Sequence, residues 1–217
     1  MVLLIIGIII FLYIVISFVV QLSQKKIDFN KPNWTKYRIK SGKSNFWPLE
    51  PWWLIFNPKG FEGLITFPEE AYTSFEEWKR DKDWYDKNKL SGLTQFYTFN
   101  DHNASLTFFN WGEEMNTFEI GGYTNYPGSQ FQWSEPLVFK AKEIAYYQCR
   151  FIGNEAHYTL TRLSDGYQIT WITPFKQSAR WLMRRIGTSI GGANNSEGEY
   201  GGESTKDFYL HSRFRIL

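Results

Sequence analysis

Hydrolytic catalysis requires a base within reach of a nucleophile, so the histidines are the first residues to consider. The chain of 217 residues has three of them, His102, His157 and His211. His157 and His211 fall in expected strands, where a hydrogen-bonded strand histidine is the simpler interpretation. Asp101 and His102 could join a metal shell, but the stretch 100–103 also has the composition of an ordinary turn. We predict no catalytic residues and no metal site, and keep an enzyme that uses Asp101 and His102 as an alternative.

Carboxylates offer a second route to catalysis, because glycoside hydrolysis needs two of them converging across one bond. Alternating acids on a strand would share a face, and no expected strand has this pattern. Glu197, Glu199 and Glu203 are close in sequence but lie in a Gly-rich stretch, and Glu113-Glu114 suits a hairpin turn. The Gly pairs lack the Gly-Lys-Ser/Thr that completes a phosphate loop. A hydrolase is therefore a less favoured alternative, and no cofactor is predicted.

Aromatic side chains point to binding rather than catalysis. They make up 19% of the chain, with ten tryptophans. An exposed ring can stack on a sugar, whereas a buried ring fills the core, and both interpretations stay open for each residue. We predict an aromatic ligand-binding face, with a glycan as the candidate ligand. Its candidate members are Trp52, Trp53, Trp111, Trp133 and Trp171.

The N-terminal segment has the character of a membrane anchor. Residues 2–20 carry no charged side chain, and nineteen helical residues span about 28 Å, close to the hydrocarbon thickness of a bilayer. A cleaved signal peptide would carry basic residues before this run and a small-x-small site after it. We predict a single transmembrane helix at 1–22, with a cleaved signal and a buried core segment as the alternatives.

A basic stretch follows the anchor. Residues 23–45 are polar, with Asp28 as their only acid, and are expected to form a juxtamembrane tether. Charge in this position predicts a domain on the cytoplasmic side and contact with the lipid surface, while the outer side stays open as an alternative. The basic excess lies beside the anchor rather than on the domain, so no nucleic acid is expected as a partner. The predicted membrane-surface residues are Lys25, Lys26, Lys31, Lys36 and Arg38.

Residues 46–217 are expected to form one all-β domain, because short aromatic and β-branched runs alternate with turn signals. Gly153-Asn154 and Asp165-Gly166 predict an antiparallel meander over 143–173. A capping box at 74–77 predicts one surface helix, which begins after Ser74 and ends at Gly92. The expected strands are 46–57, 61–67, 93–99, 104–111, 117–123, 143–152, 155–163, 166–173 and 207–217.

From residue 84 onward, the chain resembles a group of uncharacterised bacterial proteins with a concanavalin-like jelly-roll sandwich. The resemblance rests on residues 86–93 (DKNKLSGL), on the strands 105–111 and 118–123, and on Arg185-Ile186-Gly187 with Gly191-Gly192. The chain departs from the group at Ser204-Thr205, where an Ala-Pro pair is expected. The resemblance implies an antiparallel β-sandwich and no particular reaction.

Together, these features predict a membrane-anchored, non-catalytic β-sandwich that acts as a binding or assembly module. The bilayer is one partner, and a glycan or a protein is the other. An accessory subunit that docks to another membrane protein is the alternative, because an anchor, a short tether and no catalytic set would serve that role equally well.

Overall fold

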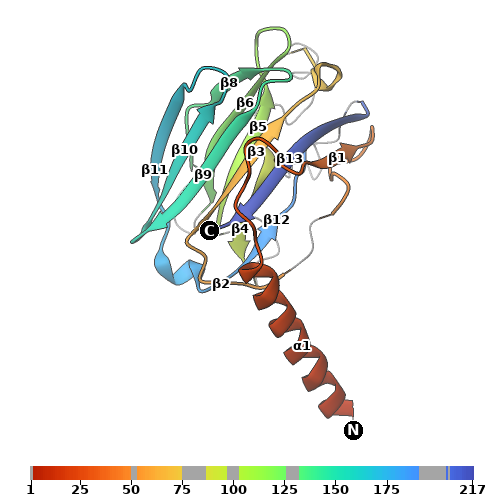
Figure 1. The fold of residues 1–217 in the computed structure, drawn as a ribbon, viewed down its shortest axis with the longest axis vertical. Coiled ribbons are helices and arrows are strands. Elements are labelled where there is room, and N and C mark those ends of the chain that lie inside the picture. The colour runs from red at the N-terminus through yellow and green to blue at the C-terminus, as the bar shows by residue number, and fades with distance from the viewer. Residues whose placement is uncertain are drawn as a thin grey trace, which may run out of the picture.

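The computed structural model describes residues 2–49, 53–74, 87–96, 103–125, 132–190, 204 and 206–217. Two antiparallel sheets face each other, and helix α1 (Val2–Leu22) projects from one end of this sandwich (Figure 1). The predicted fold class, an antiparallel β-sandwich preceded by an apolar helix, is therefore confirmed. The remaining elements are β1 (Thr35–Ile39), β2 (Ile55–Phe56), β3 (Gly60–Thr66), η1 (Glu69–Ala71), β4 (Asn88–Gln95), β5 (Ala104–Trp111), β6 (Thr117–Asn125), β7 (Gln132–Trp133), β8 (Leu137–Lys140), β9 (Ala145–Ile152), β10 (Glu155–Arg162), β11 (Gln168–Pro174), η2 (Gln177–Arg180), β12 (Leu182–Ile186) and β13 (Phe208–Ile216).

Sheet A has six strands in the order β1-β13-β3-β9-β10-β11. Strands β9, β10 and β11 form the predicted antiparallel meander, in which Tyr158 is paired with Cys149 on one side and Trp171 on the other. Gly153, at φ +56°, takes the left-handed conformation that the turn between β9 and β10 requires. The predicted C-terminal strand is also present, because β13 lies between β1 and β3 and so holds the end of the chain in the sheet.

Sheet B runs in the order β2-β12-β4-β5-β6-β7, and β8 pairs with β6. Its central strand β5 is buried along its whole length. Since side chains alternate between the faces of a strand, Ser105 and Phe109 point to the core and Leu106 and Phe108 to the outer face. The outer face of sheet B is therefore shielded from solvent along its centre.

The core between the sheets is built largely from aromatic rings. Phe67, just after β3, stacks on Phe118 of β6 with the ring centroids 4.2 Å apart. Phe67 also packs against Phe109 and Phe139, and none of these four side chains is more than 1% exposed. The high aromatic content of the chain thus serves burial between the two sheets.

Hydroxyl groups connect the two sheets inside this apolar layer. The Ser91 and Tyr147 hydroxyls lie 2.7 Å apart, and those of Ser105 and Tyr158 lie 2.6 Å apart. In each pair the serine belongs to sheet B and the tyrosine to sheet A. A buried hydroxyl that loses its partner costs free energy, so these pairs favour one alignment of the sheets.

Cys149 lies in the same layer and is fully buried. Burial raises the pKa of its thiol to about 12. Because the thiolate is the reactive form, we expect no labelling of the folded chain by a thiol reagent at pH 8, and complete labelling in denaturant. Rapid labelling of the folded protein would contradict this placement.

The surface helix predicted between Ser74 and Gly92 is wrong over its C-terminal part. Residues 75–86 lie outside the described residues, but Asn88–Gln95 form β4, paired with β5 on one side and β12 on the other. Leu90 and Leu93 of this strand are fully buried. Sheet pairing and burial thus override the local helical pattern.

The range 23–45, predicted to be a tether, contributes an edge strand. Strand β1 pairs with the first half of β13. Before it, Ile27 is buried and Phe29 packs edge-on against Tyr146 of β9, with the centroids 5.4 Å apart. Alternation was the missed signal, because Tyr37 and Ile39 are buried while Lys36 and Arg38, which alternate with them, are exposed.

Candidate functional site

The end of α1 is fastened to the base of the sandwich, which is the end that carries β2. Gln21 uses its whole side-chain amide for this: Nε2 donates to the Phe56 carbonyl and Oε1 accepts from the Phe56 N–H, both at 2.9 Å. The amide therefore takes the place of a neighbouring strand along the edge of β2. One turn earlier on α1, the Phe18 ring meets the Phe56 ring edge-on at 6.3 Å.

Two further side chains, one on α1 and one just after it, form hydrogen bonds with the backbone of the sandwich. Ser17 Oγ accepts from the Leu54 N–H at 3.3 Å, and Ser17 is fully buried. Gln24, just after the helix, accepts the Ile216 N–H of β13 at 3.0 Å. The anchor and the domain are thus joined through backbone groups of two different strands.

Sequence reasoning missed this junction, although a signal was present. Ser17, Gln21 and Gln24 follow one another at i, i+4 and i+7, which places them on one face of a helix. Polar side chains in a membrane-spanning run are costly unless they face protein. Their spacing therefore marks the face of the helix that meets the domain.

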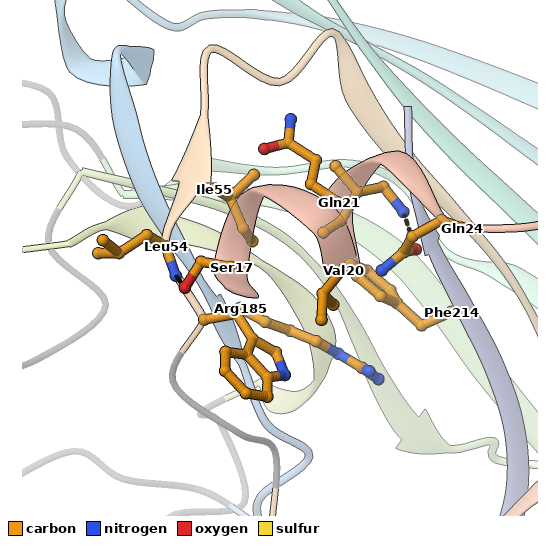
Figure 2. Close-up of a pocket in the computed structure, with 10 residues that line it drawn as sticks. Ser17, Val20, Gln21, Gln24, Leu54, Ile55, Arg185 and Phe214 are labelled. Atoms are coloured by element: carbon orange, nitrogen blue, oxygen red, sulfur yellow. Dashed lines mark hydrogen bonds between the residues drawn. The ribbon is translucent and has the colours of Figure 1, made fainter. Parts of the chain in front are cut away.

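A cavity of about 200 Å³ lies between α1 and the base of the sandwich. Figure 2 shows that Val20 of α1 and Gln24, just after the helix, line it together with Ile55, Arg185 and Phe214 of the sandwich. The Arg185 guanidinium lies 4.1 Å from the centre of the Phe214 ring, and its Nη2 donates to the Tyr37 hydroxyl at 3.1 Å. Arg185 is the only charged residue among the described residues that line this cavity.

The tryptophans predicted to form one aromatic face are spread over the molecule. Trp111 is buried, and its Nε1 donates to the Ala71 carbonyl at 2.9 Å, so it belongs to the core. Trp171 is half-buried and packs against the Tyr158 ring at 5.3 Å. The Trp111 ring thus lies in the core, and the Trp171 ring packs against it.

The other predicted members lie elsewhere. Trp53 is half-buried, and its ring stacks on Tyr13 of α1 at 6.1 Å. Trp52 lies outside the described residues. Trp133, on β7 at the edge of sheet B, is 51% exposed and is the predicted residue that keeps a ring open to solvent.

Trp133 has charged neighbours on the outer face of sheet B. The Lys87 ammonium lies 5.8 Å from the centre of the Trp133 ring and 5.0 Å from that of Phe108. Gly121 leaves space for this arrangement, because a Cβ there would lie 2.2 Å from the Phe108 ring. Glu119 stands two residues before Gly121 on the same face. We call these five residues the Trp133 site; an exposed ring beside a cation and a carboxylate can stack on a sugar and hydrogen-bond its hydroxyls.

Burial raises the pKa of Glu119, while Lys87 opposes the shift and Glu113 adds to it. A carboxyl whose pKa is higher in the folded than in the unfolded state favours folding in its protonated form. The free energy of unfolding should therefore fall as the pH rises from about 4.5 through the raised pKa. We expect Glu119→Gln to remove this loss in urea titrations between pH 4 and pH 7. An unchanged pH profile would contradict the burial of this carboxyl.

The predicted membrane-surface residues fall into two groups. Lys25 and Lys26 follow α1 directly and are exposed, as is Lys31. Lys36 and Arg38 lie on β1, where the Lys36 ammonium sits 3.7 Å over the Tyr209 ring.

Strand β13 gives the distance between these groups. Tyr209 pairs with Arg38, whereas Ile216 bonds to the segment that follows the anchor, and the seven residue steps from Tyr209 to Ile216 span about 24 Å. Figure 1 likewise places β1 away from the end that carries α1. Charges interact over about 8 Å at physiological salt, and Arg38 pairs with Asp207 at 2.9 Å. Lys36 and Arg38 thus have partners within the sandwich, whereas Lys25, Lys26 and Lys31 stay predicted residues of the lipid surface.

The histidines and acids of the described residues do not form a metal-binding cluster. No group of three His, Cys, Asp or Glu side chains among these residues could hold a metal. His157 Nε2 lies 2.8 Å from Glu155 Oε2 on the surface, and His211 packs beside Tyr209. Asp101, His102 and the acids at 197, 199 and 203 lie outside the described residues.

Comparison with known proteins supports the fold and no closer relationship. No protein-family model matches the chain, and no curated protein matches it in sequence. A solved alginate lyase in complex with an alginate tetrasaccharide has a TM-score of 0.50 and 10% identity, over 85% of this chain and 81% of that one. The alginate lyase from Klebsiella pneumoniae has a TM-score of 0.48 and 11% identity, over 73% of this chain and 59% of that one. The basic winged bean lectin with Tn-antigen reaches a TM-score of 0.35. The match with a TM-score of 0.50 is a likeness of fold alone, and it is consistent with the predicted jelly-roll sandwich.

Proposed function

We propose that this protein is a non-catalytic binding module, held in a membrane by α1, which binds a glycan at the Trp133 site. One observation carries the anchoring: α1 is long and apolar enough to cross a membrane over Leu4–Leu22, yet its end is bonded to the sandwich through Ser17, Gln21 and Gln24. A soluble core helix would be buried along its length. This helix is exposed except where it meets the domain.

The Trp133 site supports a glycan as the ligand. Trp133 offers a flat apolar face, and Lys87 gives a positive charge that suits an acidic sugar. The alginate lyase matched at a TM-score of 0.50 is in complex with an alginate tetrasaccharide, which supports a saccharide as the kind of ligand. Because Trp53, Trp111 and Trp171 lie elsewhere in the molecule, we propose a glycan-binding site only at this edge of sheet B.

The test is binding of alginate tetrasaccharide and a panel of neutral oligosaccharides to the full chain in nanodiscs. Truncating an exposed stacking ring removes about 1.5–3 kcal/mol of apolar contact, so Trp133→Ala should weaken binding roughly ten- to a hundredfold. Trp47, 69% exposed on the segment bridged to β1, gives the matched control Trp47→Ala. No binding across the panel, or equal loss in both variants, would exclude the glycan proposal.

An accessory subunit is the second candidate, and an exposed edge favours it. Strand β11 is the last strand of sheet A, where Ile172 is 56% exposed, and Tyr167, just before the strand, is 54% exposed. An open edge strand with apolar side chains can pair with another chain. Cross-linking in membranes should then trap a stoichiometric partner, which Ile172→Lys would release. A chain that remains a lone monomer in mild detergent would exclude this role.

The two candidates differ in the side of the membrane that they require. Lys25 and Lys26 after α1 predict that the domain faces the cytoplasm, which suits an accessory subunit. A polysaccharide ligand requires the outer side. Protease added to intact and then lysed cells distinguishes them: digestion of the domain only after lysis favours the subunit, and digestion before lysis favours the glycan.

A further inference from the structure

The cavity between α1 and the base of the sandwich has a lining that suggests a ligand. It is bounded by the helix on one side and by β2, β12 and β13 on the other (Figure 2). Most of its wall is apolar, with Val20, Ile55 and Phe214 as examples, while Arg185 introduces one positive charge. A hollow with apolar walls and a guanidinium suits a ligand that is apolar at one end and anionic at the other.

The level of the cavity along α1 matches the surface of a bilayer. Its helical lining runs from Ser17 to Gln24, which is about 10 Å along the helix axis. Phe18, Val19 and Leu22 in the same stretch are 49–70% exposed, so the apolar surface of α1 continues alongside the cavity. The headgroup layer on each side of the hydrocarbon is about 5–8 Å thick. A hydrocarbon layer that ends at Leu22 therefore places its boundary with the headgroups level with the outer part of the cavity.

The guanidinium of Arg185 is held in place before any ligand arrives. It lies against the Phe214 ring at 4.1 Å, and the Tyr37 hydroxyl accepts from its Nη2 at 3.1 Å. A planar guanidinium has five N–H donors in a fixed fork that matches the oxygens of a phosphate. Restricting its rotamers in advance lowers the entropy lost on binding.

We propose that this cavity binds the headgroup of an anionic phospholipid, with the phosphate at the Arg185 guanidinium and the acyl chains along the exposed face of α1. The proposal rests on the anchoring proposed above. Lipid is favoured over free phosphate because the apolar wall of the cavity is continuous with the lipid-facing surface of α1 near Val20 and Trp53. The lipid would thus occupy the junction that holds the domain on its anchor.

The proposal is tested by measuring which lipid stays bound to the full chain. The protein is reconstituted in nanodiscs of phosphatidylcholine and phosphatidylglycerol and extracted into mild detergent, and the bound lipid is then measured by native mass spectrometry. We expect the wild-type chain to retain a single phosphatidylglycerol. Arg185→Gln should reduce this retention roughly ten- to a hundredfold, because a charge-assisted hydrogen bond is lost. Arg185→Lys should keep part of it, and the matched control Arg150→Gln, at an exposed arginine of β9, should keep all of it.

A second measurement covers the case in which Arg185→Gln does not fold. Phosphatidylglycerol should raise the melting temperature of the wild-type chain above its value in phosphatidylcholine, and Val20→Phe, which fills the cavity, should abolish the difference. Equal retention of both lipids, or retention unaffected by either substitution, would overturn the proposal. A rise in melting temperature with inorganic phosphate in lipid-free detergent would assign the site to free phosphate and overturn the lipid. Release of the wild-type chain from membranes by carbonate would instead refute the anchoring itself.

Discussion

Replacing Phe67 with alanine is expected to lower the free energy of unfolding by about 3–5 kcal/mol. The Phe67 ring lies between the two sheets, stacked on Phe118 and in contact with Phe109 and Phe139. Its removal leaves a cavity in a region where no neighbouring ring is exposed and the surrounding strands are held by sheet pairing. Urea unfolding of the full chain in detergent, followed by tryptophan fluorescence, measures the change.

Phe29→Ala is the matched control for this substitution. Phe29 is 50% exposed and makes one edge-on contact, with Tyr146. Its loss should cost about 1 kcal/mol or less. Equal destabilisation by the two substitutions would contradict the placement of the core between the sheets.

Two aspartates in the projecting part of α1 are expected to release the protein from the membrane. Ile9 and Leu12 are 59% and 50% exposed, on the part of the helix that extends away from the sandwich (Figure 1). A carboxylate at the centre of a membrane helix costs about 2.5–3.5 kcal/mol, so the pair costs about 5–7 kcal/mol. Fractionation should then find Ile9→Asp/Leu12→Asp mainly in the soluble or aggregated fraction.

The exchange Ile9→Leu/Leu12→Ile keeps both positions apolar and serves as the control. It should remain in the carbonate-resistant membrane fraction together with the wild-type chain. Membrane retention of the aspartate variant at the wild-type level would mean that α1 does not cross the bilayer. Loss of both variants would point to a defect in folding rather than in insertion.

Local patterns predicted those parts of the fold in which one signal dominates. The uninterrupted apolar run predicted α1, and turns at Gly153 and Asp165-Gly166 predicted the β9-β10-β11 meander. The C-terminal strand was predicted from its aromatic and β-branched residues. In the structure, the buried residues Phe208, Leu210 and Phe214 alternate there with less buried ones. In β9, β10 and β13 the buried side chains alternate along the strand, as the period of the sequence predicts.

The remaining features depend on partners distant in the chain. A capping signal after Ser74 favoured a helix, but pairing with β5 and β12 makes Asn88–Gln95 a strand. Whether a tryptophan is in the core or at the surface depends on which face the opposite sheet covers. Trp111 is buried and Trp133 exposed, although both stand in aromatic strand-like contexts. Sheet pairing brings Lys87 close enough to Glu119 to oppose the rise that burial causes in the pKa of its carboxyl, and no local pattern relates the two residues.

The junction between α1 and the sandwich could be predicted from the sequence only in part. The spacing of Ser17, Gln21 and Gln24 marks a face of α1, but the sequence does not identify β2 and β13 as the strands that meet it. Strand β2 is a short edge strand, and its free backbone groups are what the Gln21 amide satisfies. The polar composition of residues 23–45 predicted a tether between the anchor and the domain. In the structure, hydrogen bonds instead hold the end of α1 against the sandwich.

The most direct test of this account is the distance between the anchor and the sandwich in a bilayer. Spin labels at Ile8→Cys on α1 and Ile152→Cys at the end of β9 occupy exposed positions, 50% and 54% exposed, and the buried Cys149 should stay unlabelled. Pulsed electron spin resonance in nanodiscs should give one narrow distance distribution, which broadens when Gln21→Ala and Ser17→Ala are combined. A broad distribution in the chain that keeps Ser17 and Gln21 would show that the domain moves freely on a tether, and would contradict a sandwich fixed to its membrane helix.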